Sequence, residues 1–367
     1  MEHSLDLTYH WAGFSALVVF VIAYAFVMAE EFTHLRKSKP VVLAAGLIWG
    51  MIAIAYSNTP HYEMVEHEIR HSFLEYTELA FFLLVAMTYI NALEERNVFN
   101  SLKSWLIKNQ FSYRQLFWIT GVLAFFLSPL ADNLTTALVL CAVVVAVGSS
   151  SPKFVGLACV NIVVAANAGG AFSPFGDITT LMVWQAGQLD FLQFFALVIP
   201  SVVNYIIPAS IMHFFVSDHK PDVAETSVTI KYGGKTIILL GLLTIVTAVS
   251  FHNFLHLPPV FGMMTGLAYL QLYSFYIKIS VKDIEEQKYD FFENVARVEW
   301  DTLLFFFGVI LSVGGLGFIG YLEYVSEFMY TDLGATTANV LVGILSAIVD
   351  NIPVMFAVLT LSLIHIS

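Results

Sequence analysis

The composition of this 367-residue chain excludes an ordinary soluble domain. Hydrophobic residues make up 58% of it and charged residues only 12%, and the mean hydropathy is +0.77. Long apolar runs of this kind predict an all-α polytopic membrane protein. The net charge of −12 comes from connecting segments and a few isolated acids, and no basic patch predicts nucleic-acid binding.

Neither the cysteines nor the chain ends predict a secreted domain. Cys141 and Cys159 fall in apolar runs, where they are interpreted as small hydrophobes rather than a disulfide or metal pair. The start lacks the basic region of a signal peptide, so the run 11–29 is expected to be a retained first helix. The last residues, 361–367, read LSLIHIS, which resembles a translated sequencing adaptor. We therefore expect a C-terminally truncated chain with a non-native tail.

Apolar runs follow one another along the whole chain. Several are shorter than the roughly 20 residues that a perpendicular span requires, and we interpret these as half-helices. An amphipathic stretch at 94–110 is expected to lie along the membrane interface, with Arg96 on its polar face. The runs are 11–29, 41–56, 75–93, 112–131, 132–148, 154–168, 178–187, 190–215, 236–251, 257–278, 301–320 and 334–350.

Positive charges predict the orientation of these runs. With the N-terminus outside, every Lys and Arg except Arg70 falls on the cytoplasmic side, which is a strong positive-inside bias. Arg114 and Lys153 bracket the region 112–148, so it must enter from the cytoplasm and return there. Charge alone leaves open whether it forms two full spans or a re-entrant hairpin.

Two ordered sequence matches predict an inverted-topology repeat. EYTELAFF at 75–82 aligns with EWDTLLFF at 299–306, and SPLADN at 128–133 aligns with SAIVDN at 346–351. On the topology above the copies begin on opposite sides, as they do in secondary transporters. We therefore divide the chain into N-terminal transmembrane helices (1–71), a first repeat with a hairpin and an unwound helix (72–216), connector and scaffold helices (217–298), an incomplete second repeat (299–360) and the tail (361–367).

The stretch 161–184, NIVVAANAGGAFSPFGDITTLMVW, predicts a broken helix. Glycine costs about 1 kcal/mol and proline about 3 relative to alanine in a helix. Broken backbone at membrane depth is tolerated only inside protein or beside water, so this stretch predicts a cation site. Close helix packing is an alternative for the glycines, but it does not explain an acid and a proline in one window. The helix-breaking residues are Gly169, Gly170, Pro174 and Gly176, and the oxygen ligands are Asn167, Ser173, Asp177, Thr179 and Thr180.

The stretch 128–136, SPLADNLTT, predicts a second break. Pro129 is expected to interrupt the incoming helix, and Asp132 or Asn133 to cap the outgoing one. A plain cap in a tight turn is the structural alternative. In the functional interpretation, the Asp132 carboxylate, the hydroxyls of Thr135 or Thr136 and free backbone carbonyls face a small cation. Hard ions prefer such oxygen ligands. Asp350, Asn351 and Pro353 mirror this motif in the second repeat.

Protons and a cation compete for a buried carboxylate. A carrier that changes its facing only when Asp132 and Asp177 hold one or the other performs exchange. We therefore predict Na⁺ as the metal at these two acids.

At these motifs the chain resembles the NhaD family of sodium/proton antiporters, within the ion transporter superfamily. ADNLTTALV at 131–139 and NAGGAFSPFGDITTLMVW at 167–184 carry the resemblance. It implies efflux of Na⁺, often also Li⁺, driven by inward protons across a bacterial inner membrane, with no cofactor. It also implies a homodimer whose mobile unit carries two hairpins, tipped by 132–136 and 350–351, and two unwound segments. The first of these is 173–180, and the second has no counterpart in this sequence.

Two other classes of protein were weighed. An arsenite or di/tricarboxylate carrier of the same superfamily is the alternative, but an organic anion calls for neutral or basic groups, and both breaks carry acids. An intramembrane aspartyl protease also uses two membrane aspartates. The repeat and the paired breaks fit transport better than a catalytic dyad, so the chain is predicted not to be an enzyme.

Overall fold

The structure is a computed structural model that describes residues 6–148, 151–220, 228–280, 289–326, 334–347 and 351–366. Helices make up 82% of it, and no strand occurs in these ranges, which confirms the all-α prediction. The predicted site residue Asp350 lies outside the described residues.

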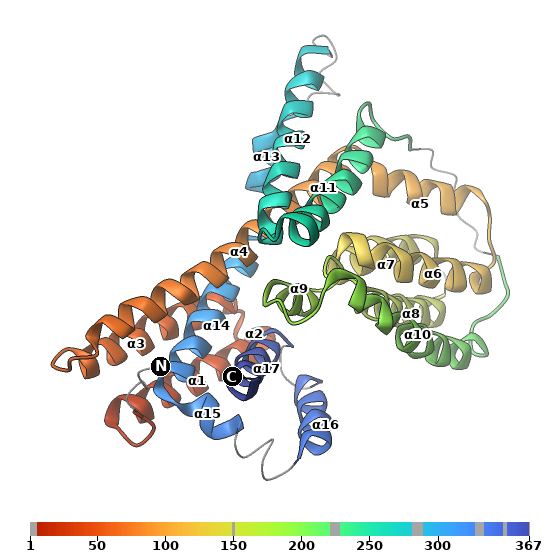
Figure 1. Ribbon diagram of the computed structural model, residues 1–367. Helices are drawn as coiled ribbons and strands as arrows, with labels where there is room; N and C mark the ends of the chain where they lie inside the picture. Colours follow the sequence, from red (N-terminus) through yellow and green to blue (C-terminus); the bar gives the residue numbers. More distant parts are fainter. Residues whose placement is uncertain are drawn as a thin grey trace. The chain divides into compact units, whose positions relative to one another are not determined.

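The helices follow the predicted apolar runs closely (Figure 1). Those before residue 150 are α1 (Trp11–Met28), α2 (Glu30–Thr33), α3 (Ser38–Tyr56), α4 (Tyr62–Glu95), α5 (Val98–Lys108), α6 (Tyr113–Ala131) and α7 (Asn133–Val147). They continue with α8 (Pro152–Gly170), α9 (Ile178–Gln185), the 3₁₀ helix η1 (Phe191–Leu197), α10 (Val198–His213), α11 (Gly234–Leu255) and α12 (Pro259–Ser280). The last are α13 (Phe291–Ala296), α14 (Trp300–Ile319), α15 (Tyr321–Ser326), α16 (Ala335–Ser346) and α17 (Asn351–Ile366).

Nine helical segments in the described ranges are long and apolar enough to cross a membrane, counting η1 and α10 as one. This confirms a polytopic membrane protein. Helix α4 has 34 residues and begins well before the predicted run, whereas α7 has 15 and α9 has 8. Helices as short as α7 and α9 do not span a bilayer alone, which agrees with the half-helices expected beside the two breaks.

The chain forms two compact units. It passes from one to the other within α4, after residue 80, and again between residues 298 and 299. The first unit comprises residues 1–80 and 299–367. In it α14 packs against α3 and α3 against α1. The Trp49 indole N–H donates to the carbonyl of Leu311 at 2.8 Å, and the Ser38 hydroxyl donates to Asp301 at 2.5 Å. These bonds tie α3 to α14 along its length.

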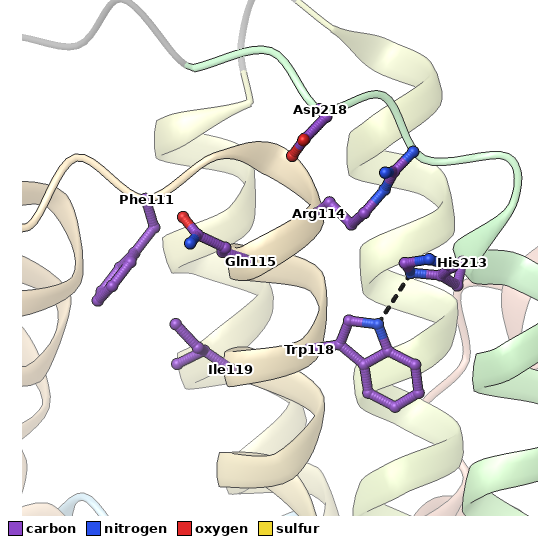
Figure 2. A pocket seen from close by; sticks show the side chains of 7 residues that line it. All are labelled: Phe111, Arg114, Gln115, Trp118, Ile119, His213 and Asp218. Carbon is purple, nitrogen blue, oxygen red and sulfur yellow. Dashed lines mark hydrogen bonds between the residues drawn. The ribbon is translucent and has the colours of Figure 1, made fainter.

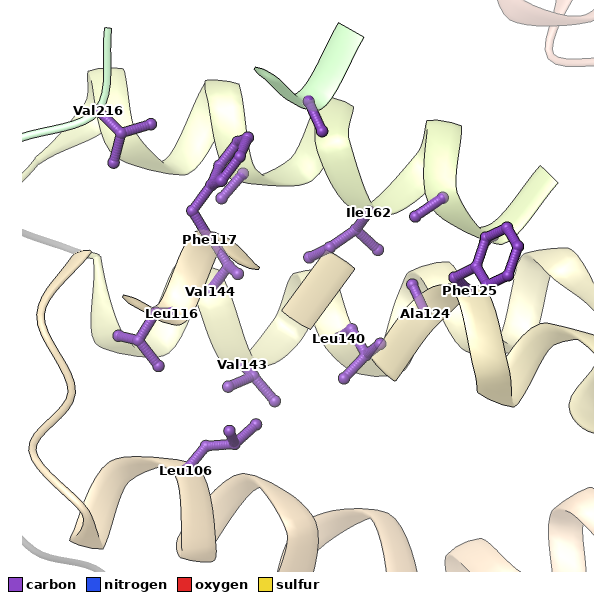
Figure 3. Packing of buried hydrophobic residues seen from close by; sticks show 14 of the residues in the cluster. Leu106, Leu116, Phe117, Ala124, Phe125, Leu140, Val143, Val144, Ile162 and Val216 are labelled. Atoms are coloured by element: carbon purple, nitrogen blue, oxygen red, sulfur yellow. The ribbon is translucent and has the colours of Figure 1, made fainter. Parts of the chain in front are cut away.

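The second unit, residues 81–298, contains both predicted breaks. Helices α5, α6, α7, α8 and α10 contribute to one apolar cluster, and Figure 3 shows Phe117 of α6, Val144 of α7 and Ile162 of α8 meeting in it. All three are almost completely buried. Because lipid tails are as apolar as these side chains, close van der Waals packing rather than water exclusion stabilises such a cluster in a membrane.

The predicted interfacial helix at 94–110 is α5, but the position predicted for Arg96 is wrong. Arg96 is only 1% exposed and lies before α5, with Asn97 between them in the left-handed conformation at φ 58°. Along α5 itself Leu106 is buried, whereas Trp105 is half exposed. The sequence pattern assigned Arg96 to the polar face because it lies opposite the apolar side chains of the stretch. Of the groups that bury it, Glu95 is its neighbour and Tyr289 lies far away in the chain.

Arg96 is buried because its charge is paired. The guanidinium bonds the Glu95 carboxylate at 2.9 Å and lies 4.7 Å from the centre of the Tyr289 ring. The other Glu95 oxygen accepts from the amide of Asn294 at 2.6 Å, and Arg96 O accepts from Lys231 N at 3.0 Å. Burial raises the pKa of the Tyr289 hydroxyl above its ordinary value. The network fastens the end of α4 to Lys231, in the segment before α11, and to Tyr289 and Asn294, before and within α13.

Removing the Glu95 carboxylate should destabilise this unit. Glu95→Ala takes the anion away from a buried guanidinium, and we expect a loss on the order of 3 kcal/mol in the free energy of unfolding. The neighbouring Glu94 provides the control, since its pair with Arg297 is half exposed at 3.4 Å. Glu94→Ala should cost less than about 1 kcal/mol. Thermal unfolding of the purified variants in detergent measures both; equal losses would contradict the role of the buried pair.

Candidate cation site

The first break falls at a single residue, Asp132. Helix α6 ends at Ala131 and α7 begins at Asn133, while Asp132 between them has φ 55° and ψ 161°. A non-glycine residue in this region costs on the order of 1–3 kcal/mol. The prediction for Pro129 needs correction, since α6 continues through the proline and stops only after Ala131.

The Asp132 carboxylate holds this strained backbone in place. One of its oxygens accepts from the Thr135 backbone N–H at 2.8 Å, and the other accepts from the Thr135 hydroxyl at 2.8 Å. Asp132 is therefore the N-cap of α7, which satisfies a backbone donor that the helix cannot. The capping role and the predicted cation-binding role therefore fall on the same carboxylate.

The second break is longer and repeats this chemistry. Helix α8 ends at Gly170, and α9 begins at Ile178 after an irregular segment. Asp177 caps α9, accepting from the backbone N–H of Thr179 at 2.8 Å and from its hydroxyl at 2.7 Å. The hydroxyl of Thr180 donates to the carbonyl of Ser173 at 2.8 Å and closes the segment on itself.

Two of the predicted helix breakers have a different role. Gly169 and Gly170 are the last residues of α8, and the irregular backbone begins after them. A Cβ at Gly169 would lie 2.1 Å from the carbonyl oxygen of Phe125, and one at Gly170 would lie 2.0 Å from the side-chain oxygen of Asn133. These glycines therefore permit close packing of α8 on the turn between α6 and α7. The helix break itself lies after them, in the segment that contains Pro174 and Asp177.

The two breaks meet in space. The Asn133 amide donates to Asp177 at 2.5 Å and to the side-chain oxygen of Asn167 at 3.4 Å. From the other side, the Ser173 hydroxyl donates to the carbonyl of Pro129 at 2.9 Å. Ser128, Pro129, Asn133, Asn167, Ser173 and Asp177 thus share one polar cluster between the breaks. We call this cluster, together with the flanking residues of the two breaks, the junction; the flanking residues are Asp132, Thr135, Thr136, Thr179 and Thr180.

Ser128 belongs to the junction, although the sequence analysis did not select it. Its hydroxyl is fully buried and donates to the side-chain oxygen of Asn133 at 2.5 Å, which orients the Asn133 amide toward Asp177. The residue stands at the start of the SPLADN motif. Nothing in the sequence shows that it bonds across the break.

Thr136 offers an uncommitted oxygen. Its side chain is only 3% exposed, and its hydroxyl has no hydrogen-bond partner among the described residues. A buried hydroxyl left without a partner costs about 1–3 kcal/mol. Within the described ranges no group of three or more His, Cys, Asp or Glu could hold a metal. The donor set is instead carboxylate, amide, hydroxyl and carbonyl oxygen.

The mirrored motif lies in the first unit. Asn351 is the first residue of α17 and is exposed, while Pro353 is buried in the first helical turn. A proline there begins a helix rather than breaking one, so the interpretation of Pro353 as a helix breaker needs correction. Helix α16 ends at Ser346 and α17 starts at Asn351.

The whole chain is similar to known membrane carriers. A profile described as citrate transporter (CitMHS) matches residues 11–366. The Na(+)/H(+) antiporter NhaD of Vibrio cholerae serotype O1 is 53% identical over 98% of this chain and 80% of that protein. The chain belongs to the NhaD family. The NhaD antiporter of Alkalimonas amylolytica is 52% identical over 97% of this NhaD-family chain and 78% of its own length. Sodium/proton antiporter 1 of Arabidopsis thaliana is 31% identical over 93% of this chain and 59% of its own length.

Family membership confirms the resemblance found at the two motifs. Both motifs lie in the second unit, and their residues form the junction. The matching profile is described as a transporter and the relatives are named antiporters, which favours transport over the protease interpretation of Asp132 and Asp177.

The close approach of α8 to α6 predicts the effect of one methyl group. Gly169→Ala would drive a Cβ into the Phe125 carbonyl, so we expect the helices to separate, the protein to lose about 1–3 kcal/mol of stability and the junction to distort. The matched control on the same helix is Gly156→Ala, because a Cβ there meets nothing within 4 Å. Thermal unfolding in detergent measures the difference. Equal midpoints for the two variants would show that the helices are not in close contact at Gly169.

Proposed function

We propose that this NhaD-family protein exchanges Na⁺ for protons across a bacterial plasma membrane, with the junction as the shared site. The single observation that carries this proposal is the hydrogen bond from Asn133 to Asp177, which joins the two interrupted helices. Asp132, the residue next to Asn133, supplies a second carboxylate at the first break, where it caps α7.

The four helix ends at the junction suit both partners of an exchange. The C-terminal ends of α6 and α8 present backbone carbonyls, which favour a cation. The N-terminal ends of α7 and α9 carry the caps Asp132 and Asp177, and their dipoles stabilise negative charge on both acids. Half-helix ends of opposite sign near the midplane are the arrangement that secondary transporters use for ions.

During transport each carboxylate exchanges a hydroxyl hydrogen bond for a contact with the cation. The Thr135 and Thr179 hydroxyls donate to the carboxylates, and a hydroxyl can rotate to present a lone pair when a cation arrives. The unpartnered Thr136 hydroxyl supplies a further oxygen. Protonation of the carboxylates removes the charge that holds Na⁺. A carrier that changes its facing only when occupied then couples the two flows.

Citrate is the second candidate cargo, because the matching family profile is described as citrate transporter. A tricarboxylate needs cationic or neutral donors, typically Arg. Every side chain in the hydrogen bonds of the junction is an acid, an amide or a hydroxyl. The amides and hydroxyls could serve either cargo, but the carboxylates of Asp132 and Asp177 repel a tricarboxylate and attract a cation, so the set favours a small cation. Citrate-dependent flux in vesicles would reverse the preference.

The finer points of the proposal have weaker but specific support. The positive-inside bias, with Arg70 as its one exception, supports an N-terminus outside. The family resemblance supports Na⁺ efflux driven by inward protons. A site of hard oxygen ligands also suits Li⁺. The family resemblance supports a homodimer and a second hairpin tip at Asp350 and Asn351.

Neutralising either acid should abolish exchange. In everted vesicles from a strain without other antiporters, Na⁺ should dissipate a preformed pH gradient, and Asp132→Asn or Asp177→Asn should remove this response by at least about tenfold. Asn can still accept the capping hydrogen bond, so the fold is expected to survive. The control is Asp190→Asn, an exposed cap of η1 away from the junction. Wild-type exchange by either junction variant would exclude that acid from the mechanism.

A further inference from the structure

A pocket of about 450 Å³ lies on the second unit, away from the residues of the junction. It covers the first turns of α6 and faces the segment that follows α10 (Figure 2). Its lining combines one cation, one anion, two hydrogen-bonding side chains and three apolar ones: Arg114, Asp218, Gln115, His213, Phe111, Trp118 and Ile119.

The pocket stands where membrane spans end. The candidate span of α6 begins at Tyr113, and the span formed by η1 and α10 ends at His213. The two ends are fastened together, since the Trp118 indole N–H donates to Nδ1 of His213 at 2.9 Å and Tyr113 N donates to the carbonyl of His219 at 2.9 Å. Two spans that end at one level mark the boundary between hydrocarbon and headgroups. A tryptophan at this level is typical of that boundary.

The polar end of the pocket carries both signs of charge. Arg114 gives one donor to the carbonyl of Val216 at 3.1 Å, and its Nε is buried with no hydrogen-bond partner in the described part of the chain. Asp218 accepts from the Ser112 hydroxyl through one oxygen at 2.7 Å. The guanidinium has five donors, and a carboxylate accepts through both oxygens, so each group can still bind a ligand.

His213 is held by a hydrogen bond within the lining, because its Nδ1 accepts from the Trp118 indole N–H at 2.9 Å. The Lys, Arg, Asp and Glu side chains of the lining are Arg114 and Asp218, one of each sign.

An apolar stripe leads away from the pocket along α6. Ile119 lines the pocket, and Val122, Phe126 and Leu130 continue its face of the helix at spacings of three and four residues. These three side chains are 41%, 65% and 49% exposed within the described part of the chain. An acyl chain can follow this stripe from the pocket into the hydrocarbon.

We propose that the pocket binds a phospholipid whose headgroup carries a primary ammonium, of the phosphatidylethanolamine class. Arg114 would bind the phosphate, Asp218 the ammonium, and the stripe of α6 an acyl chain. Such a headgroup pairs one negative and one positive charge, which is the complement of this lining. A phosphatidylglycerol headgroup also offers a phosphate to Arg114 but has no cation to pair with Asp218, and a choline headgroup has no N–H to donate.

The proposal predicts a selective loss of lipid in two variants. Purified full-length protein in detergent is exposed to equal amounts of phosphatidylethanolamine, phosphatidylcholine and phosphatidylglycerol, and bound lipid is counted by native mass spectrometry. Wild type should retain phosphatidylethanolamine about tenfold over each competitor. Asp218→Asn, which still accepts from Ser112, should bring phosphatidylethanolamine down to the phosphatidylcholine level. Arg114→Gln should lower both zwitterionic lipids, and Arg114→Lys should restore part of the loss.

Two controls separate this site from general effects. Lys108→Gln removes a positive charge from α5 outside the pocket, and Asp190→Asn removes a negative charge before η1; both should retain the wild-type preference. Soluble glycerophosphoethanolamine should compete poorly, because it lacks the chains that follow the stripe. Equal retention of the three lipids by wild type, an unchanged preference in Asp218→Asn, or strong competition by the soluble headgroup would each overturn the proposal.

Discussion

The rest of the site depends on one constraint, which is that hydrocarbon offers no hydrogen bonds to an interrupted helix. Each break must therefore satisfy its own freed groups, and each does so with an aspartate that caps the next helix and a threonine that donates to it. Asn133 then joins the two breaks by donating to Asp177. The groups that satisfy the two breaks are the same groups that a proton and a cation can compete for. This is why a plain capping role and a transport role do not exclude each other here.

Close packing provides the framework for this arrangement. Helix α8 lies against α6 with glycine backbone on carbonyl oxygen at Gly169 and Phe125. In lipid such contacts replace the hydrophobic effect as the source of helix association, because they maximise dispersion contacts and shorten electrostatic distances. The strained backbone at Asp132 persists because the surrounding helices determine its position. A junction held in this way can respond to the loss of one proton without unfolding.

Much of the fold and of the candidate site could be predicted from the sequence, because membrane helices are recognised by their length and hydropathy. The runs, the short helices beside both breaks and the importance of 128–136 and 167–180 follow from apolar length, glycine, proline and isolated acids. What failed were the features that depend on distant partners. Pro129 and Gly169 proved to be helical, and Arg96 proved to be buried against Tyr289, almost two hundred positions away. Ser128 was missed for a different reason, since its partner Asn133 is only five residues away but lies across a break whose geometry the sequence does not show.

The central claim is that protons and Na⁺ exclude each other at the junction, and proton release on Na⁺ binding tests it most directly. Purified protein in detergent is held in a weakly buffered medium, NaCl is added stepwise, and the pH is recorded against choline chloride as the control salt. The account predicts a saturable release of protons that choline does not cause, and its absence in the double variant Asp132→Asn/Asp177→Asn. Na⁺ binding without proton release in the wild-type protein, or undiminished release in the double variant, would contradict it.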